Sequence, residues 1–206
     1  MELFFFKEAY IRTSTEEYST NNIANYFIHL TNNAIQKNAT NYGQYESGNQ
    51  LSFKSLSKYM PEEKVDEIWT KIKEITYMVF SSVKKKINFY QRKNCFELFG
   101  LDYFISYDQK VWLIEVNENP CIECSSTLLS KLIPRMLNDA FKLTVDQIID
   151  KKPTEDKVYH VDGYEDHESM WESLGELTAN AEYTPSPNKK LQKMTASDIT
   201  GQTSTP

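Results

Sequence analysis

Three polar side chains interrupt an otherwise apolar stretch, residues 96–120, and offer oxygen ligands for a metal ion. They are Asp102, Glu115 and Asn117. Carboxylate and amide oxygens are hard donors, which suit Mg²⁺ better than zinc. The flanking apolar residues predict two strands, Phe96–Ile105 and Val111–Val116, that form a hairpin.

The register of this hairpin decides whether the acids meet. If the turn is centred on 108–109, Tyr107 pairs with Lys110 and Asp102 lies directly across from Glu115. Like charges at facing positions repel each other, so the pair predicts a cation between them. The alternative is a solvent-facing strand pair with incidental acids.

Composition limits the class of protein. The chain has 206 residues with 40% hydrophobic and 13% aromatic residues, enough for a globular core. Its net charge of −6 argues against nucleic acid as a partner. No apolar run approaches the roughly 18 residues that span a membrane, so we expect no membrane partner. Three cysteines fit a reducing, cytoplasmic compartment.

The predicted class is α+β, with an antiparallel sheet packed against helices. At the N-terminus, Leu3–Phe6 and Tyr10–Thr13 predict a β-hairpin, and Tyr26–Leu30 predicts a short strand. The segment Lys37–Gln50, rich in Asn, Gly and Tyr, is typical of a long surface loop. Phe53–Met60 predicts a short helix.

Two longer helices complete the predicted domain. Pro61 opens the first, whose apolar residues recur every three or four positions from Val65 to Val83 and which ends near Lys86. The second covers Ser125–Ile149, with Pro134 marking a kink or break.

The amino-acid composition changes after residue 150. Residues 151–206 are acidic and polar and predict a mostly disordered tail, with isolated turns at Val158–Tyr164 and Met170–Leu177. We therefore divide the chain into a domain, 1–150, and a tail, 151–206.

Several linked motifs resemble the tubulin-tyrosine ligase-like family, whose members have an ATP-grasp fold. They are Arg12-Thr13, HLTN at 29–32, YGQYESGN at 42–49, FELFGLD at 96–102 and WLIEVNENP at 112–120. The resemblance covers roughly residues 3–149 and begins inside the family's catalytic region. We therefore expect the C-terminal portion of an ATP-grasp domain, without the N-terminal part that grips the adenine and phosphates.

The resemblance implies an ATP-dependent ligase that joins an amino acid, tyrosine or glutamate, to the C-terminal tail of tubulin through an acyl phosphate. Its cofactors would be ATP and Mg²⁺, and its location the cytoskeleton or cilium. Asp102, Glu115 and Asn117 would hold the metal. Arg12 would clamp a reacting carboxylate or phosphate as the catalytic residue, and Thr31 and Asn32 would bind the nucleotide. The alternative is a non-catalytic remnant that binds tubulin or microtubules.

Other residues have simpler explanations. On pattern alone Arg12 would be a surface charge, and His29 a hydrogen-bonded structural residue rather than a general base. Cys121 and Cys124 have zinc spacing but no second cysteine pair, so we interpret them as incidental.

One basic cluster is left with two interpretations. It consists of Lys84, Lys85, Lys86, Arg92 and Lys93. Such a run is either a solvated helix end or a surface that receives an acidic protein tail.

Overall fold

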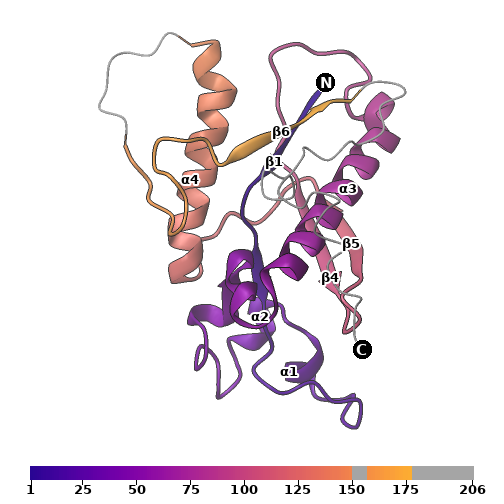
Figure 1. Ribbon diagram of the computed structural model, residues 1–206, viewed down its shortest axis with the longest axis vertical. Coiled ribbons are helices and arrows are strands. Elements are labelled where there is room, and N and C mark those ends of the chain that lie inside the picture. Colours follow the sequence, from indigo (N-terminus) through magenta and orange to yellow (C-terminus); the bar gives the residue numbers. More distant parts are fainter. Residues whose placement is uncertain (150–156, 178–206) are drawn as a thin grey trace, which may run out of the picture.

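The computed structural model describes residues 1–149 and 157–177. Six strands and four helices make up these parts (Figure 1). The strands are β1 (Glu2–Phe6), β2 (Tyr10–Arg12), β3 (Gln50–Ser52), β4 (Gly100–Ile105), β5 (Val111–Asn117) and β6 (Trp171–Glu176). The helices are α1 (Tyr26–His29), α2 (Asn33–Gln36), α3 (Glu62–Ile87) and α4 (Thr127–Leu143), with 3-10 turns at Ser47–Asn49, Phe53–Lys58 and Val145–Gln147.

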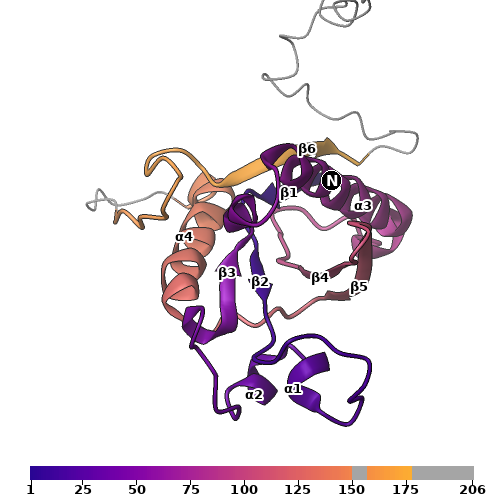
Figure 2. The same ribbon diagram turned by 60° about the horizontal axis from the view of Figure 1, so that its bottom comes forward.

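The strands form three antiparallel ribbons of two strands each. They pair β1 with β6, β2 with β3 and β4 with β5. Helices α3 and α4 lie on either side of β1 and β6, while α1 and α2 lie together at one end (Figures 1 and 2). The predicted α+β class is confirmed, with three small sheets in place of one.

Helix α3 forms as its apolar periodicity predicts and supplies most of the core. Glu62 and Glu63 lie in its first turn and lysines in its last, which suits the helix dipole. Val65, Ile68 and Ile72 are buried and pack against β4–β5 and the turn after β3. Further along the helix, a second cluster centres on buried Tyr77 and Phe80.

Ser126 caps the start of helix α4, since its hydroxyl accepts a hydrogen bond from the backbone N–H of Leu129. The helix continues through Pro134, so the predicted break is absent. Arg135 follows directly and is 1% exposed.

Arg135 ties residues 157–177 to the body of the protein. Its guanidinium donates to Asp139 Oδ2 at 2.8 Å and to the carbonyl oxygens of Tyr159 at 2.9 Å, Glu165 at 2.8 Å and Glu168 at 2.5 Å. The segment that follows ends in β6, so the isolated turn expected at 170–177 was wrong. The boundary at 150 and the nature of the rest of the tail stay predictions, since 150–156 and 178–206 lie outside the described residues.

Two N-terminal predictions were also wrong. β1 and β2 do not pair with each other, because β1 pairs with β6 and β2 with β3. The predicted strand at 26–30 is α1, whose first turn is capped by the Asn25 side chain accepting from Phe27 N. Within the described residues, no helix is both long and apolar enough to cross a membrane.

Candidate active site

The predicted pairing of Asp102 with Glu115 is confirmed, although the turn differs from the prediction. The backbone N–H of Ser106 donates to Lys110 O, and Gln109 adopts a left-handed φ of 63°. Pairing near the turn is therefore displaced by one residue, since Tyr103 faces Leu113. A bulge then restores the register.

The bulge lies where the two acids meet. Between the pairs Tyr103–Leu113 and Asp102–Glu115 the strands shift by one residue, which leaves Ile114 without an opposite partner. Tyr103 packs toward α3, where its hydroxyl lies 2.7 Å from Thr76 Oγ1. Because side chains alternate along a strand, Asp102 and the facing Glu115 lie on the surface of the ribbon away from α3.

Arg12 reaches this same surface from another ribbon. It is the last residue of β2, opposite Gln50 of β3. Its Nη2 donates to Asp102 Oδ2 at 2.9 Å, and both side chains are about one-third exposed, at 32% and 35%. The structure thus brings together a catalytic and a metal-binding candidate that lie 90 residues apart in the chain.

Asn117 is oriented by Glu115. Its Nδ2 donates to Glu115 Oε1 at 3.2 Å, which directs the amide hydrogens to the carboxylate and leaves the amide oxygen free as a donor to a cation. Two carboxylates and one amide oxygen fit Mg²⁺ in type. Within 1–149 and 157–177, no cluster of three or more His, Cys, Asp or Glu side chains suited to a metal occurs, so this site relies on the amide.

Thr31 and Asn32 lie elsewhere. They connect α1 to α2, and the Asn32 carbonyl accepts from the N–H groups of Ile35 and Gln36 as the second helix begins. Figure 2 places both helices below the ribbons, at the far end from β6. In the described parts of the chain, no hydrogen bond joins Thr31 or Asn32 to Arg12 or Asp102, so their nucleotide-binding role stays a prediction.

Sequence reasoning missed Gln36, whose hydrogen bonds connect α1 and α2 with the segment that follows β2. Gln36 is fully buried; it accepts from Thr15 N at 2.9 Å and donates to Leu30 O at 2.6 Å and Phe27 O at 3.2 Å. These bonds connect the strand end after Arg12 with the residue before Thr31. No signal in the sequence distinguishes Gln36 from an exposed glutamine on a short helix.

The predicted long loop is partly buried at its end. Asn49 and Gln50 are buried, and Gln50 Oε1 accepts from the hydroxyl of Ser126 at 2.6 Å. A Cβ added to Gly48 would lie 3.0 Å from the Cβ of Ser126, so this glycine permits the loop to approach α4. The loop therefore anchors the ribbon that carries Arg12.

A second close approach lies behind the acids. A Cβ on Gly100 would lie 2.8 Å from the Cβ of Pro120. The start of β4 is therefore in tight contact with the segment that follows Asn117, and a larger residue at Gly100 would displace that segment.

The simpler interpretations of His29 and the cysteines agree with the structure. His29 Nε2 lies 3.1 Å from the carbonyl oxygen of Asn22, and its ring meets Tyr18 edge-on. All three cysteines are exposed and free.

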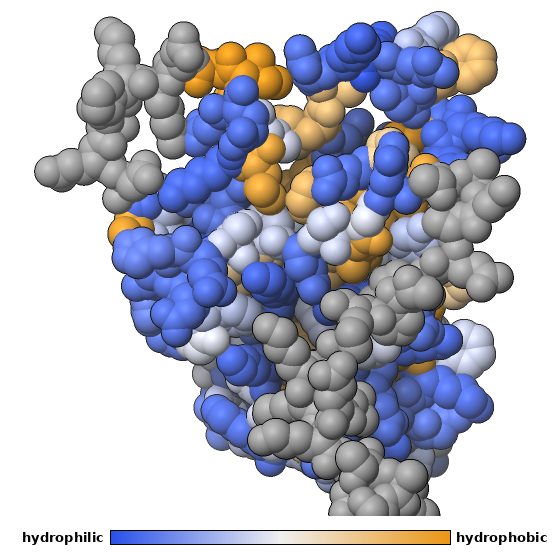
Figure 3. Space-filling model, turned by 45° about the horizontal axis from the view of Figure 1, so that its top comes forward, coloured by the Kyte–Doolittle hydropathy of each residue, from blue (hydrophilic) through white to orange (hydrophobic). Residues whose placement is uncertain are grey.

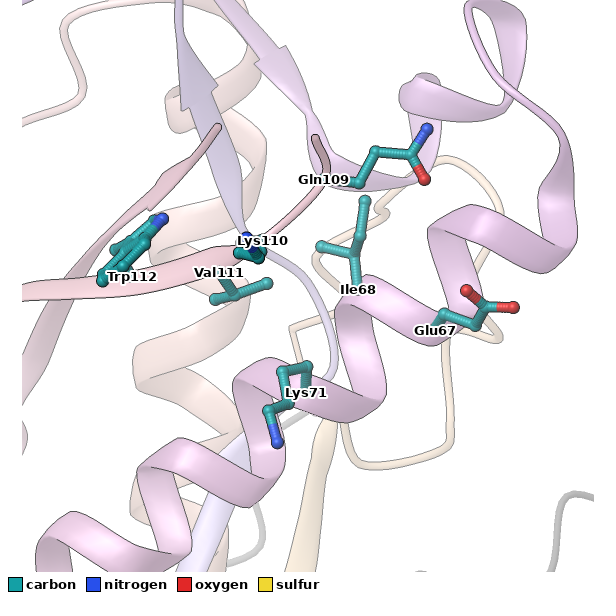
Figure 4. Close-up of a pocket in the computed structure, with 7 residues that line it drawn as sticks. All are labelled: Glu67, Ile68, Lys71, Gln109, Lys110, Val111 and Trp112. Atoms are coloured by element: carbon teal, nitrogen blue, oxygen red, sulfur yellow. The ribbon is translucent and has the colours of Figure 1, made fainter. Parts of the chain in front are cut away.

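A shallow pocket of about 420 Å³ lies between α3 and the hairpin turn (Figure 4). Its lining comes from Glu67, Ile68 and Lys71 of the helix and from residues 109–112. None of the predicted site residues lines this pocket.

Comparisons with known proteins give one consistent family. The sequence profile described as "Tubulin-tyrosine ligase family" matches residues 1–155. The chain is 37% identical over 152 residues to Tubulin glycylase 3D of Tetrahymena thermophila, which covers 71% of this chain and 15% of that protein. It is 30% identical over 139 residues to Probable tubulin polyglutamylase TTLL2 of Homo sapiens, covering 64% and 23%.

A third relative is Protein monoglycylase TTLL8 of Homo sapiens, 29% identical over 163 residues, with 73% of this chain and 18% of that protein covered. The chain thus spans less than a quarter of the length of these relatives.

Proposed function

Because this chain belongs to the tubulin-tyrosine ligase family, we propose that it is the C-terminal part of an ATP-dependent ligase that joins an amino acid to tubulin. The matched region is a small share of each relative, so the activity belongs to a larger catalytic unit to which this chain contributes one face. The ATP-grasp fold is part of the same proposal.

The observation that carries this proposal is the surface formed by Arg12, Asp102 and Glu115. Two acids face each other across a ribbon, and a cation from a separate ribbon contacts one of them. Structural ion pairs need only two members, whereas the facing Glu115 adds a negative charge that no ion pair in the described chain offsets. A bound cation would offset it.

The chemistry requires such a surface. A carboxylate is a poor electrophile until ATP converts it to an acyl phosphate, which an amine can then attack. The transferred phosphoryl group is stabilised mainly by positioning and by positive charge. Bound Mg²⁺ would supply that positive charge, and Asp102, Glu115 and Asn117 are the residues that would hold it.

Arg12 has a distinct role in this proposal. Its planar guanidinium presents several N–H donors, of which one bonds to Asp102. The remaining donors can hold a carboxylate or phosphate next to the acids and fix its orientation. The ion pair with Asp102 in turn keeps the guanidinium in place.

The names of the relatives favour glycine as the amino acid added, with glutamate second. Tyrosine, the other candidate from the sequence, has no support among them. The acceptor we propose is tubulin, which implies a cytoskeletal location.

The metal assignment can be tested without the rest of the catalytic unit. Mn²⁺ broadens the NMR signals of amides close to it, so titration should broaden those of Asp102, Glu115 and Asn117 first. Glu115→Gln should weaken metal binding about ten- to a hundredfold, as loss of a ligand or its support does. Glu123→Gln, in an exposed loop, is the matched control and should bind as the wild type does.

Equal broadening in Glu115→Gln and the wild type would overturn the assignment. Tubulin binding that persists in Glu115→Gln, in a protein that binds neither Mn²⁺ nor Mg·ATP, would favour the non-catalytic alternative instead.

A further inference from the structure

The link between α3 and β4 is a basic and aromatic segment that projects into solvent. We call residues 85–96 the basic–aromatic segment. Every residue in it is exposed except Asn88, which is half-buried. Phe89 and Tyr90 are 74% and 78% exposed, far more than aromatic residues that serve a core. Its cations are Lys85, Lys86, Arg92 and Lys93.

These cations differ from three lysines that lie earlier in α3. Lys64 pairs with Glu67 at 2.6 Å, Lys71 with Glu74 at 2.9 Å and Lys73 with Glu172 at 2.6 Å. In contrast, none of the four cations of the basic–aromatic segment forms an ion pair with any residue in 1–149 or 157–177. A chain of net charge −6 thus gathers in one short segment four cations that have no ion pair within the described residues.

The helix dipole explains only part of this arrangement. Cations in the last turn of a helix interact favourably with its carboxyl end, but that effect falls off within one turn. Arg92 and Lys93 lie beyond Ile87, where α3 ends. Their presence beside two exposed rings therefore needs another reason.

Side-chain hydrogen bonds within the segment fix the conformation of its loop. The Asn88 side chain bonds to both backbone groups of Arg92, accepting from its N–H at 2.8 Å and donating to its carbonyl at 3.1 Å. Gln91 adopts a left-handed φ of 51° that closes the turn. The guanidinium of Arg92 lies 5.9 Å from the centre of the Tyr90 ring, which meets Phe89 edge-on at 5.3 Å.

The loop leads directly into the candidate active site. β4 begins at Gly100, and Asp102 is its third residue. Figure 1 draws the link at the top of the molecule, close to the N-terminus, and Figure 3 views the molecule with this top turned forward. Hydrophilic side chains dominate that face, with smaller apolar areas between them.

We propose that the basic–aromatic segment is a docking site for an acidic peptide. Carboxylates of the peptide contact the four cations, and its aliphatic stems lie against Phe89 and Tyr90. The inference rests on the proposed function in one respect, because the peptide would be part of the acceptor protein. Four cations in an otherwise acidic protein suit a short peptide better than the dense charge of a nucleic acid.

The test is fluorescence anisotropy with a labelled oligo-glutamate peptide and the full chain. Replacing Lys85, Lys86, Arg92 and Lys93 by Gln should weaken binding at least about tenfold, because each exposed charge contact contributes a small part of the affinity and four are lost together. A matched control replaces four exposed lysines elsewhere, Lys37, Lys58, Lys71 and Lys131, by Gln and should change binding less than about twofold. Salt should weaken binding by the wild type and flatten the difference between variants.

A second variant separates the rings from the charges. Phe89→Ser with Tyr90→Ser should weaken the binding that survives at high salt while leaving its salt dependence unchanged. The proposal would be overturned if the segment variant and the control variant, each lacking four cations, lost peptide affinity equally. It would also be overturned if a single-stranded oligonucleotide or anionic lipid vesicles bound the basic–aromatic segment more tightly than the peptide does.

Glu115→Gln distinguishes this proposal from the proposed function. It should bind the peptide as the wild type does, because Glu115 lies outside the segment. In the wild type, normal peptide docking with no metal binding would remove the ligase proposal and keep the docking site. Metal binding by the wild type without docking that depends on the four cations would do the reverse.

Discussion

Among single residues, Glu8 joins parts of the protein that are far apart in the chain. It is 6% exposed and accepts hydrogen bonds from Ala9 N at 2.9 Å, Phe53 N at 3.0 Å and the Tyr164 hydroxyl at 3.2 Å. Burial raises the pKa of Glu8 above its ordinary value, although these donors oppose the shift. Burial and the nearby Glu8 carboxylate also raise the pKa of Tyr164.

The raised pKa predicts a pH dependence of stability. The folded state holds the Glu8 proton more tightly than the unfolded state does, so the free energy of unfolding falls as pH rises from about 4.5 through the folded-state pKa. Glu8→Gln keeps an acceptor oxygen but has no charge to bury. We expect urea denaturation to show a smaller loss of stability between pH 4.5 and neutral pH in Glu8→Gln than in the wild type.

Glu16→Gln, at an exposed position, should retain the wild-type pH dependence. If Glu8→Gln and Glu16→Gln follow the same pH curve, the burial of Glu8 has no energetic consequence.

The candidate site residues could be predicted in part. Asp102 and Glu115 face each other as expected, yet two errors cancelled: the turn pairs Ser106 instead of Tyr107 with Lys110, and the bulge at Ile114 restores the register. The contact of Arg12 with Asp102 depends on how two ribbons pack, which no local pattern encodes.

Among elements, those defined by local periodicity were predictable. The apolar stripe of α3 and the two strands around 106–110 are visible in the sequence, because their partners lie within a few residues or on one helix face. The pairings of β1 with β6 and of β2 with β3 were not predictable, because each joins strands that lie far apart in the sequence. WESLGE, the sequence of β6, has little β propensity and forms a strand because β1 offers it an edge.

One side chain of helix α4, Arg135, bonds to three backbone carbonyls of the segment that leads into β6. Arg135→Ala would leave the buried Asp139 carboxylate without its ion-pair partner and three backbone carbonyls without the donor that Arg135 supplies. We expect a loss of about 3–5 kcal/mol in the free energy of unfolding, measured by urea denaturation. Limited proteolysis should also cut the 157–177 segment faster in this variant.

Lys131→Ala is the matched control on the same helix. Its ion pair with Asp162 at 2.9 Å is exposed, so its removal should cost less than about 1 kcal/mol. A cost for Arg135→Ala no larger than that of Lys131→Ala would contradict the anchoring role of Arg135.

For the whole molecule, the body and the returning segment form one packed unit. Val161, Met170 and Leu177 are at most 7% exposed and pack against Leu132, Phe6 and the Tyr77–Phe80 cluster. The family profile ends at residue 155, before this segment. Sequence composition alone assigned these residues to a tail, because their burial is decided by surfaces elsewhere in the chain.

Truncation tests whether the body of the protein depends on the returning segment for its stability. A chain of residues 1–149 would expose the edge of β1 and lose the burial of Val161, Met170 and Leu177, worth roughly 1.5–3 kcal/mol each. We expect it to aggregate or to unfold at much lower urea than the full chain. Equal urea midpoints for the truncated chain and the full chain would contradict the prediction.

The pairing of β1 with β6 also sets a delay during synthesis. Ser173 lies 171 residues after Glu2, and the two side chains are in contact in the finished protein. At a translation rate of about 5–20 residues per second, β1 waits roughly 10–35 s on the ribosome for its partner. Throughout that interval the edge of β1 that later pairs with β6 is open, in a strand that contains three phenylalanines.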